Sequence, residues 1–308
     1  MIEFPLSFVY RHLFANANNL FKEFIMKYHI LYNPLAGHGS HDEKLSALKS
    51  HLNGECVEHY MTEIKCYKSF ISALAADDVI VISGGDGTLN HFINAVDTDN
   101  LENDVLYYAS GSGNDFLHDL GKKKGCEPIK INQYLKKLPT VIVKGKSYRF
   151  INGIGFGIDG YACEIGDEKK AAGKAVDYTM IAVKGLLYDY KPRNAVVNVD
   201  GKEYRINKVW IAPTMNGRYY GGGMMPAPYQ DRLGDGLVTF VGFGGSGKLK
   251  TLSILPSFFK GGHMKHKKYL TFARGKEVTV TFDTPCALQI DGETIKDVTS
   301  YTVHANVK

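Results

Sequence analysis

The chain has 308 residues, of which 44% are hydrophobic and 22% charged, and it is long enough to form two globular domains. Its five cysteines include no CxxC pair, which argues against a zinc site or a disulfide framework and favours a reducing compartment. The net charge is only +5, without a dense run of arginines and aromatics, so nucleic-acid binding is not expected. No stretch of about 18 apolar residues occurs, and we therefore expect no transmembrane segment.

Residues 1–25 are rich in Phe, Leu and Asn. They lack the basic start, the unbroken apolar core and the cleavage site of a signal peptide. Two interpretations stay open for this N-terminal extension. Either translation starts at Met26, or the segment is a short amphipathic stretch that touches a membrane surface.

The first half of the chain, residues 26–147, alternates strand and helix patterns. Strands are expected at 28–32, 56–61, 79–82 and 105–109, and helices from about 42, at 66–76 and at 89–96. The run at 79–82 is wholly apolar, as in a parallel strand covered on both faces. This alternation predicts an α/β domain with a parallel sheet.

The second half, residues 148–308, has shorter alternating segments separated by Gly or Asp-Gly turns. A hairpin is expected at 195–199 and 204–206, with further strands at 209–213, 236–242, 278–282 and 287–290. Helical inserts are expected at 169–188 and 248–259. The pattern predicts an antiparallel β-sandwich domain, with the option that the last strand returns to the first domain.

Three glycine-containing loops follow predicted strands of the first domain, at residues 33–39, 84–90 and 111–116. Glycine lets backbone N–H groups approach phosphate oxygens, and a following helix N-terminus favours negative charge. A single such loop is usually only a tight connection, but three at successive strand ends favour a phosphate site. Their spacing matches neither GxxxxGK[ST] nor GxGxxG.

Asp86 is the unusual member of the second loop, because a carboxylate repels phosphate. It could hold Mg²⁺ or a nucleotide hydroxyl, or it could cap a helix N-terminus. The sequence leaves both roles open.

The order of motifs NPLAG, GGDGTLN, GSGNDF, FINGIGFGIDG, DGLVTF and LQIDGE resembles the diacylglycerol kinase catalytic family, and the soluble bacterial lipid kinases in particular. The resemblance runs from Met26 to the C-terminus. It implies an α/β domain like that of NAD kinases and phosphofructokinases, a C-terminal β-sandwich, and an active site between them. GGDGT alone is shared with those two enzyme families, but the full ordered set is not.

The resemblance also implies roles for individual residues. Asp291, Glu293 and Asp86 would be catalytic, because a lipid hydroxyl must lose a proton as it attacks the γ-phosphoryl group. Which of Asp291 and Glu293 is the base stays open, and Asp291-Gly292 alone would be read as a hairpin turn. Asp235, with the carbonyls of Arg232 and Leu237, would bind Mg²⁺. ATP would be held by Asn33, Pro34, Leu35, Ala36, Gly37, Thr62, Gly84, Gly85, Asp86, Gly87, Thr88, Leu89, Asn90, Ser112, Asn114, Asp115 and Lys184.

The sequence departs from the family pattern at two places. His38 stands where relatives carry Lys or Arg, and residues 141–143 lack an aspartate found in many relatives. The first change weakens an expected phosphate contact. The second leaves metal binding or rate in doubt.

The expected function is therefore phosphoryl transfer from ATP, with Mg²⁺, to a lipid hydroxyl, most simply that of diacylglycerol, giving phosphatidic acid. We expect a cytoplasmic protein that contacts membranes peripherally through Lys265–Lys268 and the nearby Phe258 and Phe259. The alternatives are an NAD kinase-like enzyme and a non-catalytic nucleotide- or lipid-binding protein. The lipid stays open, as does the oligomeric state, for which a homodimer is one option.

Overall fold

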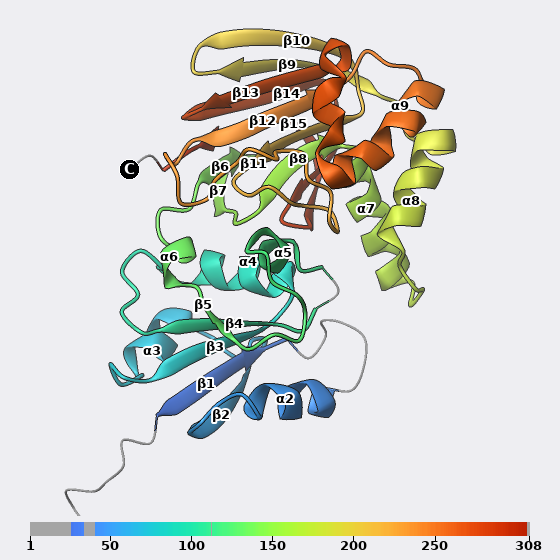
Figure 1. Cartoon of the computed structure of the whole chain (residues 1–308). Helices are drawn as coiled ribbons and strands as arrows, with labels where there is room; N and C mark the ends of the chain where they lie inside the picture. Colours follow the sequence, from blue (N-terminus) through green and yellow to red (C-terminus); the bar gives the residue numbers. More distant parts are fainter. Residues whose placement is uncertain (1–25, 34–40, 112, 307–308) are drawn as a thin grey trace, which may run out of the picture.

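The computed structural model describes residues 26–33, 41–111 and 113–306, which form two domains, each with its own β-sheet (Figure 1). The N-terminal extension, residues 34–39 of the first glycine loop (among them Pro34, Leu35, Ala36, Gly37 and His38) and Ser112 lie outside the described residues. The expectations for these residues stay predictions.

The first sheet has five strands in the order β2-β1-β3-β4-β5. Their bounds are β1 Lys27–Tyr32, β2 Glu55–Tyr60, β3 Val79–Gly84, β4 Val105–Ala109 and β5 Ile129–Lys130. The first four are mutually parallel, and β5 is antiparallel to β4. Strand β3 is buried over its whole length, which explains its uninterrupted apolar sequence. The predicted parallel α/β domain is confirmed.

Helices cover both faces of this sheet. They are α2 His41–Lys49, α3 Tyr67–Ser72, α4 Asp86–Ala95, α5 Asp115–Asp119 and α6 Asn132–Leu135. On one face Leu48 packs with Val81, and on the other Phe92 packs with Ile80 and Ile82. Alternate residues of a strand thus serve two cores. Figure 1 shows α4 and α5 between this sheet and the second domain.

The second domain is built on a ten-stranded sheet whose pairings are all antiparallel, as predicted. Strands β9 and β10 branch from β14, and the remaining order is β13-β12-β11-β8-β14-β15-β6-β7. The bounds are β6 Thr140–Val143, β7 Lys146–Arg149, β8 Gly153–Gly157, β9 Arg193–Val199, β10 Lys202–Val209, β11 Ile211–Met215, β12 Val238–Phe243, β13 Leu270–Gly275, β14 Glu277–Ile290 and β15 Glu293–His304. The segments expected as two strands at 278–282 and 287–290 are one strand, β14, whose register shifts between Thr281 and Cys286.

The helical inserts of the second domain differ from the single helix expected at 169–188. Helix α7, Ile158–Ala171, ends before Gly173, which has a φ of +67°. Helix α8, Tyr178–Lys184, then continues into a π-helical turn, Gly185–Asp189. Helix α9, Lys248–Ile254, is followed by 3₁₀ turns at Leu255–Lys260, Gly262–Lys265 and Lys267–Tyr269. Helices α7, α8 and α9 gather at one side of the second sheet (Figure 1).

The two domains join through the β6–β7 hairpin. Strand β6 pairs with β15, so residues 140–149 already belong to the second sheet, and the expected boundary at 147–148 falls inside this hairpin. Strand β15 in turn lies between β14 and β6. The last strand, β15, is thus part of the second sheet. The end of the predicted first domain, residues 140–147, belongs to that sheet as well.

Candidate active site

The second and third glycine loops pack backbone against backbone at the carboxyl edge of the first sheet. Gly84 and Ala109 are register partners at the ends of β3 and β4. A Cβ on Gly111 would lie 2.4 Å from the Cα of Gly85, and one on Gly84 would lie 2.2 Å from Thr88 Oγ1. Only glycine allows the two loops to approach this closely, which leaves backbone N–H groups of both at one edge.

Asp86 binds the backbone of the neighbouring loop. Its Oδ2 accepts from the N–H of Asp115 at 2.7 Å, and its Oδ1 accepts from the N–H of Phe116 at 3.0 Å. The carboxylate therefore caps α5, and not the helix that it begins. Burial raises the pKa of Asp86, while these hydrogen bonds and the positive charge of Arg232 oppose the shift.

Asp115 connects the first domain to the second. Its carboxylate accepts from the N–H groups of Gly222, at 2.9 Å, and Gly223, at 2.6 Å, in a loop of the second domain. Both glycines have positive φ, so their N–H groups can point at one carboxylate. Burial, followed by the negative charge of Asp86, raises the pKa of Asp115 to about 7.

A second, buried carboxylate of α5 makes ion pairs across the same boundary, one with a buried arginine and one with a partly exposed arginine. Asp119 accepts from Arg218 Nε at 2.6 Å and also from Arg232 Nε. Arg232 is 6% exposed and further donates to the carbonyl of Ile151 and, at 2.6 Å, to the Oδ1 of Asn152. Sequence reasoning missed Asp119 and Arg218. The four-residue spacing of Asp115 and Asp119 was the available signal, because it puts both carboxylates on one side of a helix.

Asp291 is fully engaged by hydrogen bonds. Its carboxylate accepts from the backbone N–H groups of Ile151 (2.6 Å), Asn152 (2.8 Å) and Gly153 (3.0 Å), and from Asn90 Nδ2 at 2.9 Å. Burial raises its pKa, whereas these donors act to lower it. Four donors occupy the lone pairs of a carboxylate, so Asp291 is suited to fixing the backbone and not to accepting a substrate proton.

Glu293, unlike Asp291, lies beside the second glycine loop. A Cβ on Gly87 would lie 3.1 Å from Glu293 Oε1, and Glu293 itself is exposed. Asp291 and Gly292 form the two-residue turn between β14 and β15, with φ of +47° and +93°. The Asp291-Gly292 hairpin turn is therefore part of the candidate site, because it places Glu293 beside Gly87.

Buried hydrogen bonds connect this turn to helix α7. Asp159, at the start of α7, accepts from Gln289 Nε2 at 3.4 Å, and Gln289 Oε1 accepts from the N–H of Gly292 at 2.9 Å. Burial raises the pKa of Asp159 to about 7, and hydrogen bonds from its surroundings, including that from Gln289, oppose the shift. The Asp159 side chain is thus connected, through Gln289, to the turn that carries Glu293.

The remaining predicted nucleotide-binding residues fall in different places. Asn33 and Thr62 follow β1 and β2 at the same sheet edge, where the N–H of Met61 donates to the carbonyl of Tyr32 at 2.9 Å. Thr88 and Leu89 are buried in α4. Asn90 is committed to Asp291 and the Arg149 carbonyl. Asn114 donates to the Gly111 carbonyl at 3.0 Å, and its Oδ1 is buried without a partner among the described residues. Lys184 is exposed at the end of α8, outside these loops.

Lys124 is an exposed cation beside the candidate site that sequence reasoning did not single out. Its Nζ donates to the carbonyl of Gly111 at 2.9 Å, so the ammonium group lies at the third glycine loop. The residue was visible in the sequence only as the last of three consecutive lysines. A lysine at such a loop is suited to balancing phosphate charge.

The predicted Mg²⁺ site does not fit the side chains that surround it. Asp235 Oδ1 accepts from Arg274 Nη2 at 2.8 Å and from the N–H of Leu237 at 3.1 Å, and the hydrogen bond from Leu237, followed by Arg274, lowers its pKa. The Leu237 carbonyl accepts from Gln230 Nε2 at 2.8 Å. The guanidinium of Arg274 thus stands at the carboxylate where a cation would bind. No group of three or more His, Cys, Asp or Glu suited to a metal occurs among the described residues.

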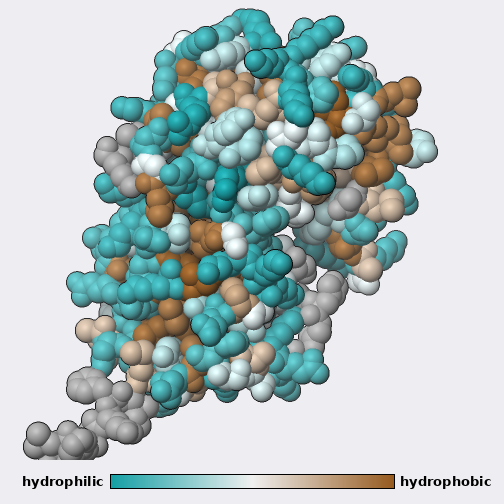
Figure 2. Space-filling view, viewed as in Figure 1, coloured by the Kyte–Doolittle hydropathy of each residue, from teal (hydrophilic) through white to brown (hydrophobic). Residues whose placement is uncertain are grey.

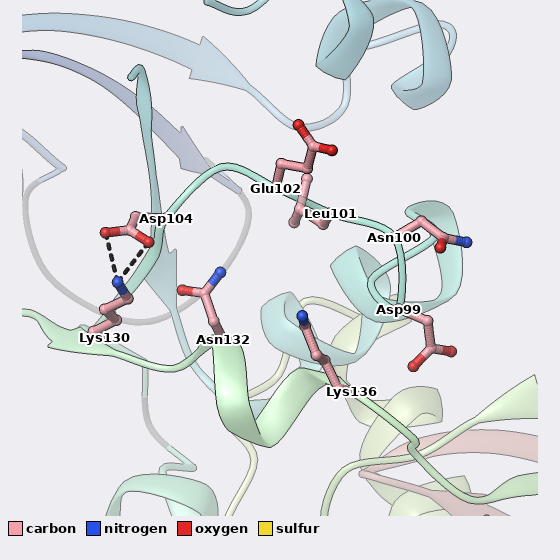
Figure 3. Close-up of a pocket in the computed structure, with 8 residues that line it drawn as sticks. All are labelled: Asp99, Asn100, Leu101, Glu102, Asp104, Lys130, Asn132 and Lys136. Atoms are coloured by element: carbon pink, nitrogen blue, oxygen red, sulfur yellow. Dashed lines mark hydrogen bonds and ion pairs between the residues drawn. The ribbon is translucent and has the colours of Figure 1, made fainter. Parts of the chain in front are cut away.

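A cavity of about 490 Å³ lies elsewhere in the first domain (Figure 3). Its lining includes Asp104 and Lys130, joined by an ion pair of 2.6 Å, as well as Glu102 and Asn132. Asp104 directly precedes β4, whereas Gly111 follows the other end of that strand. The cavity therefore lies at the amino edge of the sheet, away from the glycine loops.

Comparison with known families agrees with this arrangement. Residues 27–147 match the model of the diacylglycerol kinase catalytic domain, and residues 152–305 match that of the YegS C-terminal NAD kinase beta sandwich-like domain. The chain belongs to the family of lipid kinases of the diacylglycerol kinase and YegS type. Family membership supports a kinase.

Curated relatives and solved structures extend the likeness over most of the chain. A Staphylococcus aureus (strain Newman) protein named "Putative lipid kinase" is 27% identical over 271 residues, covering 85% of this chain and 87% of the relative. A Bacillus subtilis (strain 168) protein named "Putative lipid kinase YtlR" is 24% identical over 231 residues, covering 64% of this chain and 71% of the relative. A crystal structure of a Bacillus anthracis str. Sterne diacylglycerol kinase has a TM-score of 0.57 at 16% identity, covering 92% of this chain and 96% of that one. At that identity the match shows the fold. No helix among the described residues is long and apolar enough to cross a membrane.

Proposed function

We propose that the protein transfers the γ-phosphoryl group of ATP to the hydroxyl group of a lipid, with diacylglycerol as the first candidate and phosphatidic acid as its product. The observation that carries this proposal is the position of the Glu293 carboxylate against Gly87 of the nucleotide loop. A proton acceptor beside a phosphate-binding loop is what transfer to a hydroxyl requires. The lipid-kinase names of the relatives supply the acceptor class.

We assign the general base to Glu293. The hydroxyl oxygen of the lipid attacks the γ-phosphorus, its proton passes to a carboxylate oxygen of Glu293, and the bond to the β-phosphate oxygen breaks to release ADP. Asp291 holds the turn in place, because its oxygens already accept four N–H donors. The hydrogen bonds of Asp291 and the exposure of Glu293 support this division of roles.

The nucleotide is held, in this proposal, by the carboxyl edge of the first sheet. Backbone N–H groups of the glycine loops face the phosphates, and Lys124 supplies a positive charge at Gly111. Asp86 acts as a positioning residue, since its two oxygens fix the third loop to the second. A divalent cation is expected to arrive with the phosphates of ATP, and Mg²⁺ is the usual one.

The test is phosphate transfer from radiolabelled ATP to diacylglycerol in mixed micelles, run beside NAD and beside a total lipid extract. Label in phosphatidic acid supports the proposal. Label in another lipid would change the acceptor and keep the reaction class. Label in NADP in place of lipid would identify an NAD kinase-like enzyme, and ATP binding without turnover would identify a non-catalytic binding protein.

A further inference from the structure

A face of the second domain combines exposed apolar side chains with lysines. Leu249 on α9 is 82% exposed, Tyr188 in the π-helical turn 75%, and Tyr229 72%. Met180 on α8 and Phe259 are also exposed. Figure 2 shows the brown patch over α8 and α9. We call this set, with Lys184, Lys248, Lys250 and Lys260, the apolar–basic face.

Contacts make the apolar–basic face one continuous surface. Lys248 Nζ donates to the Leu187 carbonyl at 3.1 Å, which joins α9 to the π-helical turn next to Tyr188. The 3₁₀ turn that carries Phe259 follows α9 directly, and the N–H of Met225 donates to the Phe258 carbonyl at 2.8 Å. The expectation that Phe258 also faces outward is wrong. It is fully buried and packs against Phe243.

The segment that contains α9 and the 3₁₀ turns after it carries charges of one sign only. From Gly236 to Lys276 the sequence contains no Asp or Glu. Its basic residues are Lys248, Lys250, Lys260, Lys265, Lys267, Lys268, Arg274 and Lys276. Over the whole chain, by contrast, 37 Lys and Arg are nearly balanced by 32 Asp and Glu. Acidic groups lie on the adjoining elements: Asp177 and Asp189 at the start of α8 and the end of the π-helical turn, Glu164, Asp167 and Glu168 on α7, and Asp231 two residues after Tyr229.

The face continues into the loop that reaches the candidate active site. Gly222 and Gly223, which bind Asp115, precede Met225, which is hydrogen-bonded to the turn carrying Phe259. The apolar–basic face is therefore connected, through this loop, to Asp115 of the candidate active site. A lipid hydroxyl has to arrive there from a membrane.

We propose that the apolar–basic face binds the surface of an anionic lipid bilayer, with Tyr188 and Leu249 entering the headgroup region and the lysines beside phosphate groups. Exposed apolar side chains ringed by lysines suit that boundary, where the lysine stems lie along the apolar layer. A second copy of the chain fits less well, because a two-fold contact would set like charges against each other. The inference rests on the proposed function, since a lipid acceptor is what brings the protein to a bilayer.

The first experiment measures binding of the full chain to sedimented vesicles of phosphatidylcholine, with and without phosphatidylglycerol. Wild type should bind the anionic vesicles and lose binding at high salt. Lys248→Gln with Lys250→Gln should weaken binding about fivefold per lysine. Leu249→Ser with Tyr188→Ser should weaken it roughly tenfold or more. The matched controls, Ile142→Ser and Lys146→Gln with Lys202→Gln, change exposed residues of other elements and should bind like wild type.

The second experiment separates this inference from the proposed function. Each variant is assayed with a short-chain diacylglycerol below its aggregation concentration, where no bilayer is present. Variants of the apolar–basic face should keep wild-type turnover there and lose it only on vesicles. A protein that binds vesicles but phosphorylates no lipid would refute the kinase and keep the surface. The inference would be overturned if the variants of the apolar–basic face bound vesicles like wild type. It would also be overturned if the variants changed a dimer into a monomer in solution without weakening vesicle binding.

Discussion

Asn90 of the first domain donates a hydrogen bond of 2.9 Å to the Asp291 carboxylate of the second, across 201 positions of sequence. The bond joins α4, which begins at the GGDGT loop, to the turn that carries Glu293. The second glycine loop and Glu293 are thereby held at a fixed separation by a contact near both. The geometry of the site depends on this contact between domains.

Glu293→Gln should lower turnover, whereas Asp291→Ala should lower the stability of the fold. Glu293→Gln removes a proton acceptor that is exposed, so kcat should fall by about 10²–10⁴ while the free energy of unfolding stays unchanged. Asp291→Ala leaves buried N–H donors without an acceptor and should lower the free energy of unfolding by about 3 kcal/mol or more. Urea titrations and steady-state kinetics on both variants check this. A stable Asp291→Ala protein with wild-type turnover would contradict the assignment.

Lys124→Gln should raise the KM for ATP by about tenfold with little change in kcat, because a lysine–phosphate contact acts on bound nucleotide before and during transfer. Lys123→Gln is the matched control, one residue earlier in the same run of lysines. The measurement is the KM for ATP at saturating lipid. Equal KM values for the two variants would place Lys124 outside the nucleotide site.

The two arginines on Asp119 should contribute unequally to stability. Arg232 is buried at 6% exposure, whereas Arg218 is 39% exposed. Arg232→Gln leaves Asp119 without its buried partner and should cost about 3–5 kcal/mol of unfolding free energy. Arg218→Gln should cost about 1 kcal/mol, since water can replace an exposed donor. Urea unfolding followed by circular dichroism tests the order, and similar losses for both variants would contradict it.

Stability should fall as the pH rises from about 4 to about 7, in part because of Asp159. Its pKa is about 7 in the folded protein against an ordinary value of 3.8, so the unfolded chain binds fewer protons in this range. The full effect of one such group is at most about 4 kcal/mol. Asp159→Asn should reduce the slope, and the remaining slope includes Asp115, whose pKa is also about 7.

The check on Asp159 is the free energy of unfolding at pH 5 and pH 8. Asp42→Asn, a change at an exposed position of α2, serves as the control and should keep the wild-type slope. An Asp159→Asn protein with an unchanged difference between the two pH values would show that Asp159 does not hold its proton in the fold.

Local pattern was enough to predict much of this protein. The buried run of β3 and the glycine loops after parallel strands are encoded by neighbouring residues, so the α/β domain, the antiparallel domain and the sheet edge where the glycine loops meet could be expected. Element bounds were less certain. Helix α7 begins eleven residues before the insert expected at 169, because Gly157, with a φ of +128°, ends β8 and starts a helix that apolar periodicity did not reveal.

The family resemblance implied catalytic roles for Asp86 and Asp291, and only the tertiary structure shows what each carboxylate contacts. Both carboxylates accept backbone N–H groups from segments that are distant in sequence: Asp115 and Phe116 for Asp86, and residues 151–153 for Asp291. A sequence shows which side chains carry charge, but burial and the approach of donors determine how many lone pairs remain. In the same way, packing of the two domains brings Glu293 to Gly87, and folding of the first domain brings Lys124 to Gly111.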